Sequence, residues 1–278
     1  MSGFFYFYHI SIKKMKAKLY FILFFFLLFP KFIFAQIVVT NKEEAKKVLQ
    51  KAIDDLNDLN CKSSLNNAQK LLQYSLRNND NSYAAKAYNI IGLNYEEFSD
   101  LKKALYYYKE GIKYAIKAND KQLLEYLYNN IGNLYFFGLD NPEKGLEYYF
   151  KCYKYSLKYA DKLEIAFTEL NIVAAYFRLE KFDAGKVYLD KILPTLKSEN
   201  DFEMYITYHT LLGNYNSSKN KNTEAEKNYN LVLERLKENN LDFFKSNELE
   251  IYNEIYKFYK KNNNNDKALF FLEKHDKL

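Results

Sequence analysis

The sequence predicts an all-α fold built from stacked helical hairpins. An aspartate returns at Asp80, Asp120, Asp161, Asp201 and Asp242, at intervals of 40 or 41 residues, and periods of this size are typical of stacked supersecondary units. Between these aspartates, apolar residues fall at the three- and four-residue spacings of helices. Runs in which β-branched residues alternate with polar ones are almost missing, so strands have few candidates. The 278 residues are 48% hydrophobic and 27% charged, which is typical of a globular chain.

Residues 1–35 are predicted to be an export signal with a short extension before it. Lys18 ends a basic stretch, residues 19–29 are apolar, and the small Ala35 offers a cleavage site before Gln36. We therefore expect the mature chain to begin at Gln36 and to lie in the periplasm or the cell envelope.

The alternative is an uncleaved leader that anchors the chain in a membrane through residues 19–39. Pro30 and Lys31 interrupt this run, which then falls short of the roughly 20 apolar residues that a membrane span needs. Cleavage after Ala35 is therefore favoured. Contact with a membrane is expected only through the leader, if it stays uncleaved.

Removal of the leader changes the charge balance. Residues 1–35 hold five of the 41 basic residues and no acidic residue, so the remaining chain has 36 basic against 35 acidic side chains. Binding of nucleic acid needs clustered excess positive charge, and we expect no such partner. Cys61 and Cys152 are too few for a disulfide framework, and both are predicted to be unpaired.

Residues 128–152 are the clearest predicted hairpin, with two helical runs separated by the turn GLDNPEKG. Gly138 is expected to end the first helix in a left-handed conformation, and Asn141 to cap the second helix, with a proline at its first position. Gly132 and Gly145 lie inside the helices, where glycine costs about 1 kcal/mol against alanine. Close helix packing is the expected reason for them.

The same two-helix pattern recurs along the chain. Each periodic aspartate is expected to cap an apolar helix, and Asp161 and Glu164 have the spacing of a capping box. The small position of the first helices is assigned to Gly92, Gly132, Ala174 and Gly213, with Tyr256 in the last repeat. The second helices carry Ala104 and Tyr108, Gly145 and Tyr149, Gly185 and Leu189, Ala225 and Tyr229, and Ala268 and Leu272.

This pattern resembles the tetratricopeptide repeat, which has a large aromatic residue, leucine with glycine, and tyrosine on its first helix, and alanine followed by an aromatic residue on its second. The resemblance implies a right-handed α-α superhelix of about five to six helix-turn-helix repeats, with a period of about 40 residues. The array is assigned to residues 36–278, with a degenerate first repeat at 43–79 and clearer repeats at 82–278.

In the last predicted helix, Leu269 and Phe270 lie on the face that would meet a following helix. Self-association through this helix is one expectation from this pattern. The alternative is that these are two tolerated exposed apolar residues.

The resemblance also implies a ligand groove lined by the first helices, where the matching positions are Asn89, Asn129, Asn171 and Asn253. Because asparagine both donates and accepts hydrogen bonds, such a row can hold an extended peptide backbone. Alternatively, asparagine is simply abundant in this composition. The residues expected beside the row are Tyr126, Asn133, Phe136, Phe137, Arg178, Asn214 and Lys257. The aromatic residues would anchor apolar groups, and the two cations would receive acidic side chains or a carboxylate.

Enzyme and metal-site patterns are absent from the sequence. His209 takes a core position of its repeat, and the chain has no glycine-rich phosphate loop, HExxH or CxxC pair. We therefore predict a non-enzymatic protein- or peptide-binding scaffold with no cofactor, metal or catalytic residue. The alternative is the extracytoplasmic sensor part of a signalling or transcription-regulatory system, with its membrane span and output domain outside this chain. Exported arrays of this type resemble the sensor regions of bacterial histidine kinases and helix-turn-helix regulators.

Overall fold

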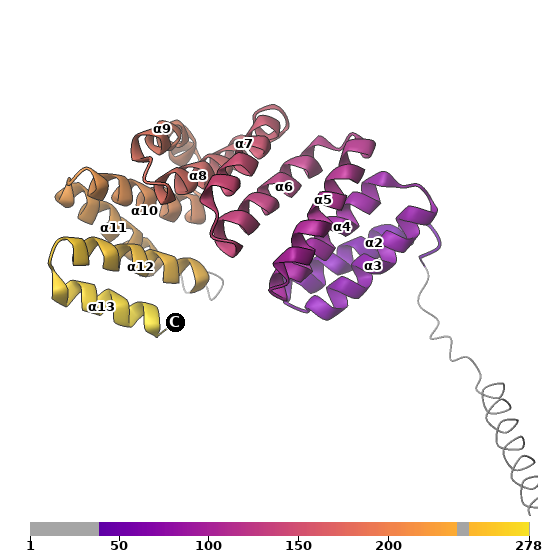
Figure 1. Ribbon diagram of the computed structural model, residues 1–278, viewed down its shortest axis with the longest axis horizontal. Helices are drawn as coiled ribbons and strands as arrows, with labels where there is room; N and C mark the ends of the chain where they lie inside the picture. The colour runs from indigo at the N-terminus through magenta and orange to yellow at the C-terminus, as the bar shows by residue number, and fades with distance from the viewer. Residues whose placement is uncertain (1–38, 238–244, 278) are drawn as a thin grey trace, which may run out of the picture.

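The computed structural model describes residues 39–237 and 245–277, and within these ranges all regular elements are helices. They pair into six hairpins, which stack along an arc (Figure 1). The pairs are α2 (Lys42–Asn57) with α3 (Cys61–Arg77), α4 (Asn81–Glu97) with α5 (Leu101–Ala118), α6 (Lys121–Asn133) and η1 (Leu134–Gly138) with α7 (Pro142–Tyr159), α8 (Lys162–Arg178) with α9 (Phe182–Ser198), α10 (Phe202–Ser218) with α11 (Asn222–Lys237), and α12 (Lys245–Lys261) with α13 (Asn265–Asp276). The predicted fold class, an all-α superhelix of helix-turn-helix repeats, is confirmed.

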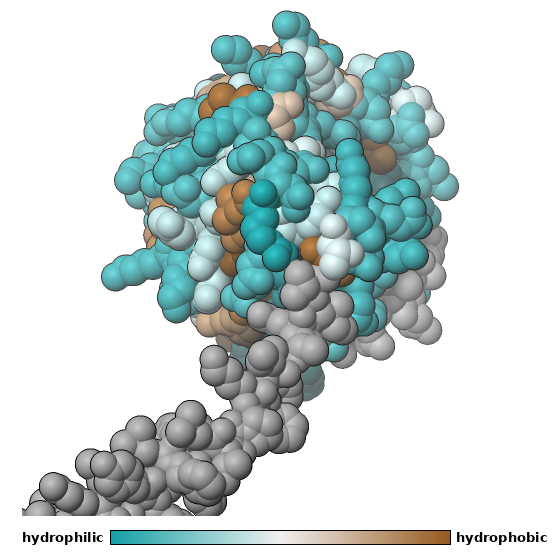
Figure 2. Space-filling model, turned by 90° about the vertical axis from the view of Figure 1, so that its right-hand side faces the viewer, coloured by the Kyte–Doolittle hydropathy of each residue, from teal (hydrophilic) through white to brown (hydrophobic). Residues whose placement is uncertain are grey.

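The predicted leader, its cleavage site after Ala35 and the periodic Asp242 lie outside the described residues. In the part of the chain that is described, no helix is both long and apolar enough to cross a membrane. Viewed from the end that holds the first hairpins, the surface is mostly hydrophilic, with apolar residues in small, separate groups (Figure 2). At the other end, Leu269 and Phe270 of α13 are exposed, and self-association through them stays a prediction.

Aspartate caps begin the first helices of four hairpins. Asp80, Asp120, Asp161 and Asp201 precede α4, α6, α8 and α10, and each carboxylate accepts a hydrogen bond from the backbone amide three residues ahead, at 2.8–3.1 Å. A carboxylate at this position also opposes the positive end of the helix dipole. The predicted capping box is present, because the Glu164 side chain accepts a hydrogen bond from the Asp161 amide. The sequence period therefore marks helix starts.

The turn inside the third hairpin differs from the expectation. No described glycine has a positive φ, and the left-handed residue of this turn is Asp140, with a φ of 44°. Gly138 instead ends the short π-helix η1, so the prediction of a left-handed Gly138 is wrong. The amide of Asn141 donates to the carbonyl of Tyr135, six residues back, whereas the equivalent bond of Asp100 reaches only five residues back. The π-helix absorbs this additional residue.

A glycine on the first helix faces a tyrosine ring on the second in three of the hairpins. The pairs are Gly92 with Tyr108, Gly132 with Tyr149, and Gly213 with Tyr229. A Cβ atom at Gly132 would lie 2.6 Å from carbon atoms of the Tyr149 ring. Because Tyr149 is only 1% exposed, its ring cannot swing out to make room. These glycines are therefore explained by close helix packing, as predicted.

The fourth hairpin follows the same rule with other residues. The three glycines each lie twelve residues after a capping aspartate, and the residue twelve positions after Asp161 is Val173. The alignment of Ala174 with the glycines is therefore wrong by one residue. Val173 and Leu189 are fully buried in one core cluster. A larger residue on the first helix is thus accommodated by a smaller one on the second.

A small residue on the first helix is thus paired with a large one on the second, and this relation predicts the result of a double-mutant cycle in the third hairpin. Gly132→Ala should lower the free energy of unfolding by about 1–3 kcal/mol, despite its better helix propensity, because the added methyl group overlaps the Tyr149 ring. In a Tyr149→Leu background the same substitution should cost much less. Urea unfolding of the four proteins measures this coupling. Equal costs in both backgrounds would contradict the packing account.

One half-buried carboxyl group in the second hairpin has a strongly shifted pKa. Burial raises the pKa of Glu96 to about 7, with a smaller contribution from Glu97, although the hydrogen bond donated by the Tyr108 hydroxyl opposes the shift. Between pH 4.5, the ordinary pKa of this group, and about 7, the folded chain keeps a proton that the unfolded chain has lost. The free energy of unfolding therefore falls as pH rises through this window.

Glu96→Gln is expected to remove this pH dependence, because the amide keeps an oxygen acceptor for the Tyr108 hydroxyl and cannot ionise. At pH 8 the variant should be more stable than the wild type by about 1–3 kcal/mol, and the difference should vanish near the ordinary pKa of a glutamate. Urea unfolding at several pH values is the measurement. Glu234→Gln, on the exposed face of α11, is the control and should change little. A difference between Glu96→Gln and wild type that does not vary with pH would refute the assignment.

Candidate functional site

The first helices of hairpins three to six line a groove of about 1050 Å³. Most of its walls come from α6 with η1, α8, α10 and α12. Eight of the eleven predicted site residues line it, namely Asn129, Asn133, Phe136, Phe137, Asn171, Arg178, Asn214 and Lys257. These residues are brought together from four hairpins, and their role in binding stays a prediction.

The other three predicted residues lie outside the groove lining. Asn89 belongs to the second hairpin, and its side-chain oxygen accepts a hydrogen bond from Asn130 at 2.9 Å. The Tyr126 hydroxyl donates to a carboxylate oxygen of Glu164 at 3.0 Å. Asn253 is half-buried on α12 and is not among the lining residues. The groove therefore begins only at the third hairpin, and the predicted row does not run its full length.

Asparagines form pairs between neighbouring first helices rather than one row of equivalent residues. Asn171 donates to Asn129 at 2.9 Å, in the same way as Asn130 donates to Asn89. Asn171 and Asn130 both lie ten residues after their capping aspartates, and Asn129 and Asn89 lie nine residues after theirs. The predicted equivalence of Asn171 with Asn129 is therefore wrong by one residue. The Asn171–Asn129 pair fixes side-chain amides of α8 and α6 at the groove wall.

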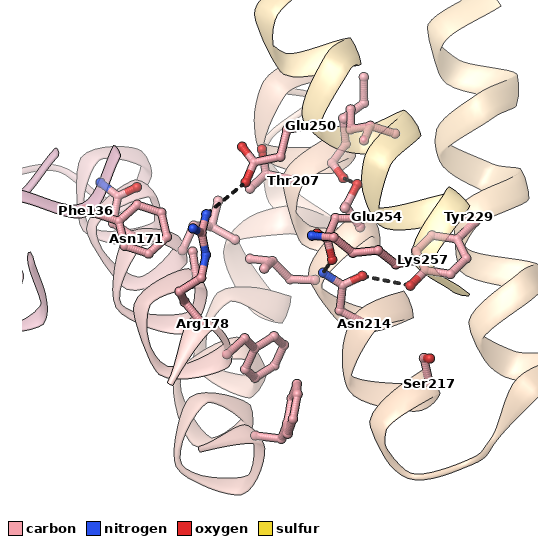
Figure 3. Close-up of a pocket in the computed structure, with 18 of the residues that line it drawn as sticks. Phe136, Asn171, Arg178, Thr207, Asn214, Ser217, Tyr229, Glu250, Glu254 and Lys257 are labelled. Carbon is pink, nitrogen blue, oxygen red and sulfur yellow. Dashed lines mark hydrogen bonds and ion pairs between the residues drawn. The ribbon is translucent and has the colours of Figure 1, made fainter. Parts of the chain in front are cut away.

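The tyrosines that close the hairpins also orient two asparagines of the groove. The Tyr149 hydroxyl donates to Asn133 at 2.9 Å, and the Tyr229 hydroxyl donates to Asn214 at 2.7 Å. Each of these asparagines directly follows the glycine that faces the ring. Asn214 in turn donates to Glu254 at 2.9 Å and links α10 to α12 (Figure 3). Core packing and groove geometry thus depend on the same side chains.

An aromatic pair lines the groove at the π-helix. Phe136 is buried and Phe137 is 58% exposed, and their ring centroids lie 4.6 Å apart at an interplanar angle of 87°. The guanidinium carbon of Arg178 lies 4.9 Å from the centroid of the Phe136 ring. Arg178 also reaches Asp140 at 3.3 Å. It lies 3.9 Å from Glu250 of α12 (Figure 3). The π-helix therefore offers one exposed aromatic ring, that of Phe137, while the buried ring of Phe136 lies beside Arg178.

Sequence reasoning missed two polar stripes at helical spacing. On α10 the stripe is Glu203, Thr207, Thr210 and Asn214, and on α12 it is Glu250, Glu254, Lys257 and Lys261. Members of each stripe are three or four residues apart and so share a helix face. Asn214 and Lys257 were among the predicted residues. Extending from these two by helical spacing would have found the others.

The two outer acids of these stripes have raised pKa values. Partial loss of water raises the pKa of Glu250, helped by the charge of Glu254 and opposed by Arg178 and Lys257. Partial loss of water, with a smaller effect of Asp201, also raises the pKa of Glu203. Both carboxylates are accessible from the groove, so a cation placed beside them would stabilise their charged forms.

The groove lining is suited to holding a ligand through hydrogen bonds, apolar contact and charge. Among the described residues, no group of three or more His, Cys, Asp or Glu side chains is placed to hold a metal ion. His209 is half-buried, with Nδ1 at 2.8 Å from the Asn228 side-chain oxygen, and burial lowers the pKa of its imidazole.

No protein-family model matches the chain, and no curated protein sequence matches it. Solved structures do match it in fold. The apo form of RapI is 14% identical, with 86% of this chain and 84% of that chain covered and a TM-score of 0.69. A Rap protein complexed with competence and sporulation factor is 13% identical, with coverages of 86% and 65% and a TM-score of 0.65. The apo form of the quorum sensor NprR from B. thuringiensis is 16% identical, with coverages of 96% and 71% and a TM-score of 0.62.

These neighbours are tetratricopeptide-like helical-repeat proteins. At such identities the likeness establishes the fold. The chain is therefore a helical-repeat protein with a tetratricopeptide-like fold, and its groove is lined by the first helices of four consecutive hairpins.

Proposed function

We propose that this chain is a non-enzymatic scaffold that binds a peptide, or an extended segment of a protein, in the groove. The observation that carries the proposal is the lining itself. Asn129 and Asn171 come from two neighbouring first helices, and beyond their mutual hydrogen bond the Asn129 amide nitrogen and the Asn171 amide oxygen have no partner among the described residues. Both lie in one groove with the exposed ring of Phe137. Amides pair with a peptide backbone whatever its side chains are, and an aromatic ring supplies apolar contact area.

Two neighbours in fold support this proposal. One is a Rap protein in complex with competence and sporulation factor, and the other is described as a quorum sensor. The quorum sensor also favours the second candidate function, in which ligand capture by this chain is the sensor step of a signalling or transcription-regulatory system. Together with the predicted leader at residues 1–35, this candidate places the sensor step outside the cytoplasm.

Selection from a random dodecapeptide library displayed on phage tests the groove. The immobilised chain should enrich a defined set of peptides, and the variant Asn129→Ala/Asn171→Ala/Phe137→Ala should bind a selected peptide at least about tenfold more weakly, because it loses both amides and the free ring. Fluorescence anisotropy with the synthetic peptide gives the Kd.

The matched control is Tyr106→Ala/Asn230→Ala, which removes an aromatic ring and an amide from exposed positions on α5 and α11. This control should bind like the wild type, and thermal unfolding should show that both variants are folded. Failure of the wild type to enrich any peptide, or equal Kd values for the groove variant and the wild type, would rule out the groove as the binding site.

Export is tested separately by mass spectrometry of the chain isolated from the cell envelope. The proposed processing gives an N-terminal peptide that begins at Gln36. A Gln36→Pro variant, which places a poor residue directly after the cleavage site, should accumulate with its leader attached. Recovery of native chain that still carries residues 19–35 would instead support the membrane anchor.

A further inference from the structure

The cations of the groove are already partnered within the chain. The Arg178 guanidinium lies near two carboxylates, those of Asp140 and Glu250. The Lys257 ammonium pairs with Glu254 at 2.6 Å, and the Lys261 ammonium donates to the backbone carbonyl of Ser217 at 2.7 Å. A ligand carboxylate would have to compete with these partners. The expectation that Arg178 and Lys257 receive acidic groups stays a prediction, and selection of acidic peptides by the wild type would support it.

The acids of the groove are in excess. Glu180, Glu203, Glu250 and Glu254 line it against three cations. Among the described side chains, Glu203 has no ion-pair partner, and Glu250 has only the 3.9 Å contact with Arg178. That distance is near the limit for an ion pair, and both partners are about half exposed. Pairs of this kind contribute little. Two carboxylates are therefore available to a ligand.

Glu203 and Glu250 both line the groove. They lie on α10 and α12, which are adjacent first helices. Glu250 faces Thr207 across the gap between these helices (Figure 3), and Glu203 precedes Thr207 by one helical turn on the same face. The loss of water that raises the pKa values of both carboxyls is the cost that a ligand cation would offset.

We propose that this part of the groove is a cation subsite, in which Glu203 and Glu250 receive a positively charged group of the bound peptide, either a Lys or Arg side chain or the free amino terminus. The proposal rests on the proposed peptide-binding function. Phe137 packs against Phe136, whose ring lies beside the same Arg178 that reaches Glu250, and its exposed ring then takes an apolar side chain of the same peptide. The expected ligand carries both features and has few acids.

The test repeats the dodecapeptide selection with three proteins: the wild type, Glu203→Gln/Glu250→Gln and the control Glu234→Gln/Glu273→Gln. The control removes the same charge from exposed positions on α11 and α13. Peptides selected by the wild type and by the control should be enriched in Lys and Arg, and depleted in Asp and Glu, relative to the unselected library. The groove variant should still select peptides, but without this enrichment.

Three results would overturn the proposal. Enrichment of acidic peptides by the wild type would show that the subsite has the opposite preference, and unchanged Lys and Arg enrichment by the groove variant would place the cation elsewhere. Both of these results leave peptide binding intact. If the wild type selects no peptide at all, the proposed function fails and this inference fails with it.

A second measurement identifies the charged group. The selected peptide is synthesised in its native form, with an acetylated amino terminus, and with each lysine replaced by norleucine or each arginine by citrulline. One of these changes should weaken binding to the wild type by about 10-fold or more, the size expected for a charge-assisted hydrogen bond. The same change should have little effect on binding to Glu203→Gln/Glu250→Gln. Equal losses on both proteins would contradict the assignment.

Discussion

The contact between a glycine on one helix and a tyrosine ring on the next decides how closely the two helices pack in three of the hairpins. Where the first helix carries Gly92, Gly132 or Gly213, the ring lies directly against the helix backbone. Where it carries Val173, the second helix supplies Leu189 in place of a tyrosine. A single hairpin cannot bury its apolar faces alone, so the neighbouring hairpins complete the core. The close packing of helices within hairpins two to five depends on this balance of side-chain size.

The same contact extends from the core into the groove. Tyr149 and Tyr229 pack their rings against glycines in the core. Their hydroxyl groups extend to the groove, where they donate hydrogen bonds to Asn133 and Asn214. Further amide contacts, such as Asn171 to Asn129, join neighbouring hairpins beside the groove. The side chains offered to a ligand are therefore positioned by groups that also stabilise the fold. Substitution of a core tyrosine should therefore lower stability and also release the groove asparagine to which its hydroxyl donates.

The sequence was sufficient for the fold, because caps and glycines recur with a period that only stacked helical units explain. The sequence was insufficient where the structure depends on the exact alignment of the repeats, which one inserted residue changes. The additional residue of the third hairpin forms a π-helix and moves the left-handed position to Asp140, and a one-residue shift made Ala174 and Asn171 look equivalent to residues that they are not. Periodicity locates helix faces but does not say which hairpins enclose a groove. For this reason Asn89 was included, whereas Glu203 and Glu250 were missed.

The central claim is that a peptide lies against the first helices of hairpins three to six. Photo-crosslinking tests it most directly, with a selected dodecapeptide that carries benzophenone at successive positions and with mass spectrometry to locate the adducts. The account predicts adducts on α6, η1, α8, α10 and α12, with the charged end of the peptide nearest α10 and α12. Adducts concentrated on the exposed faces of α5, α7, α9 and α11 would contradict it.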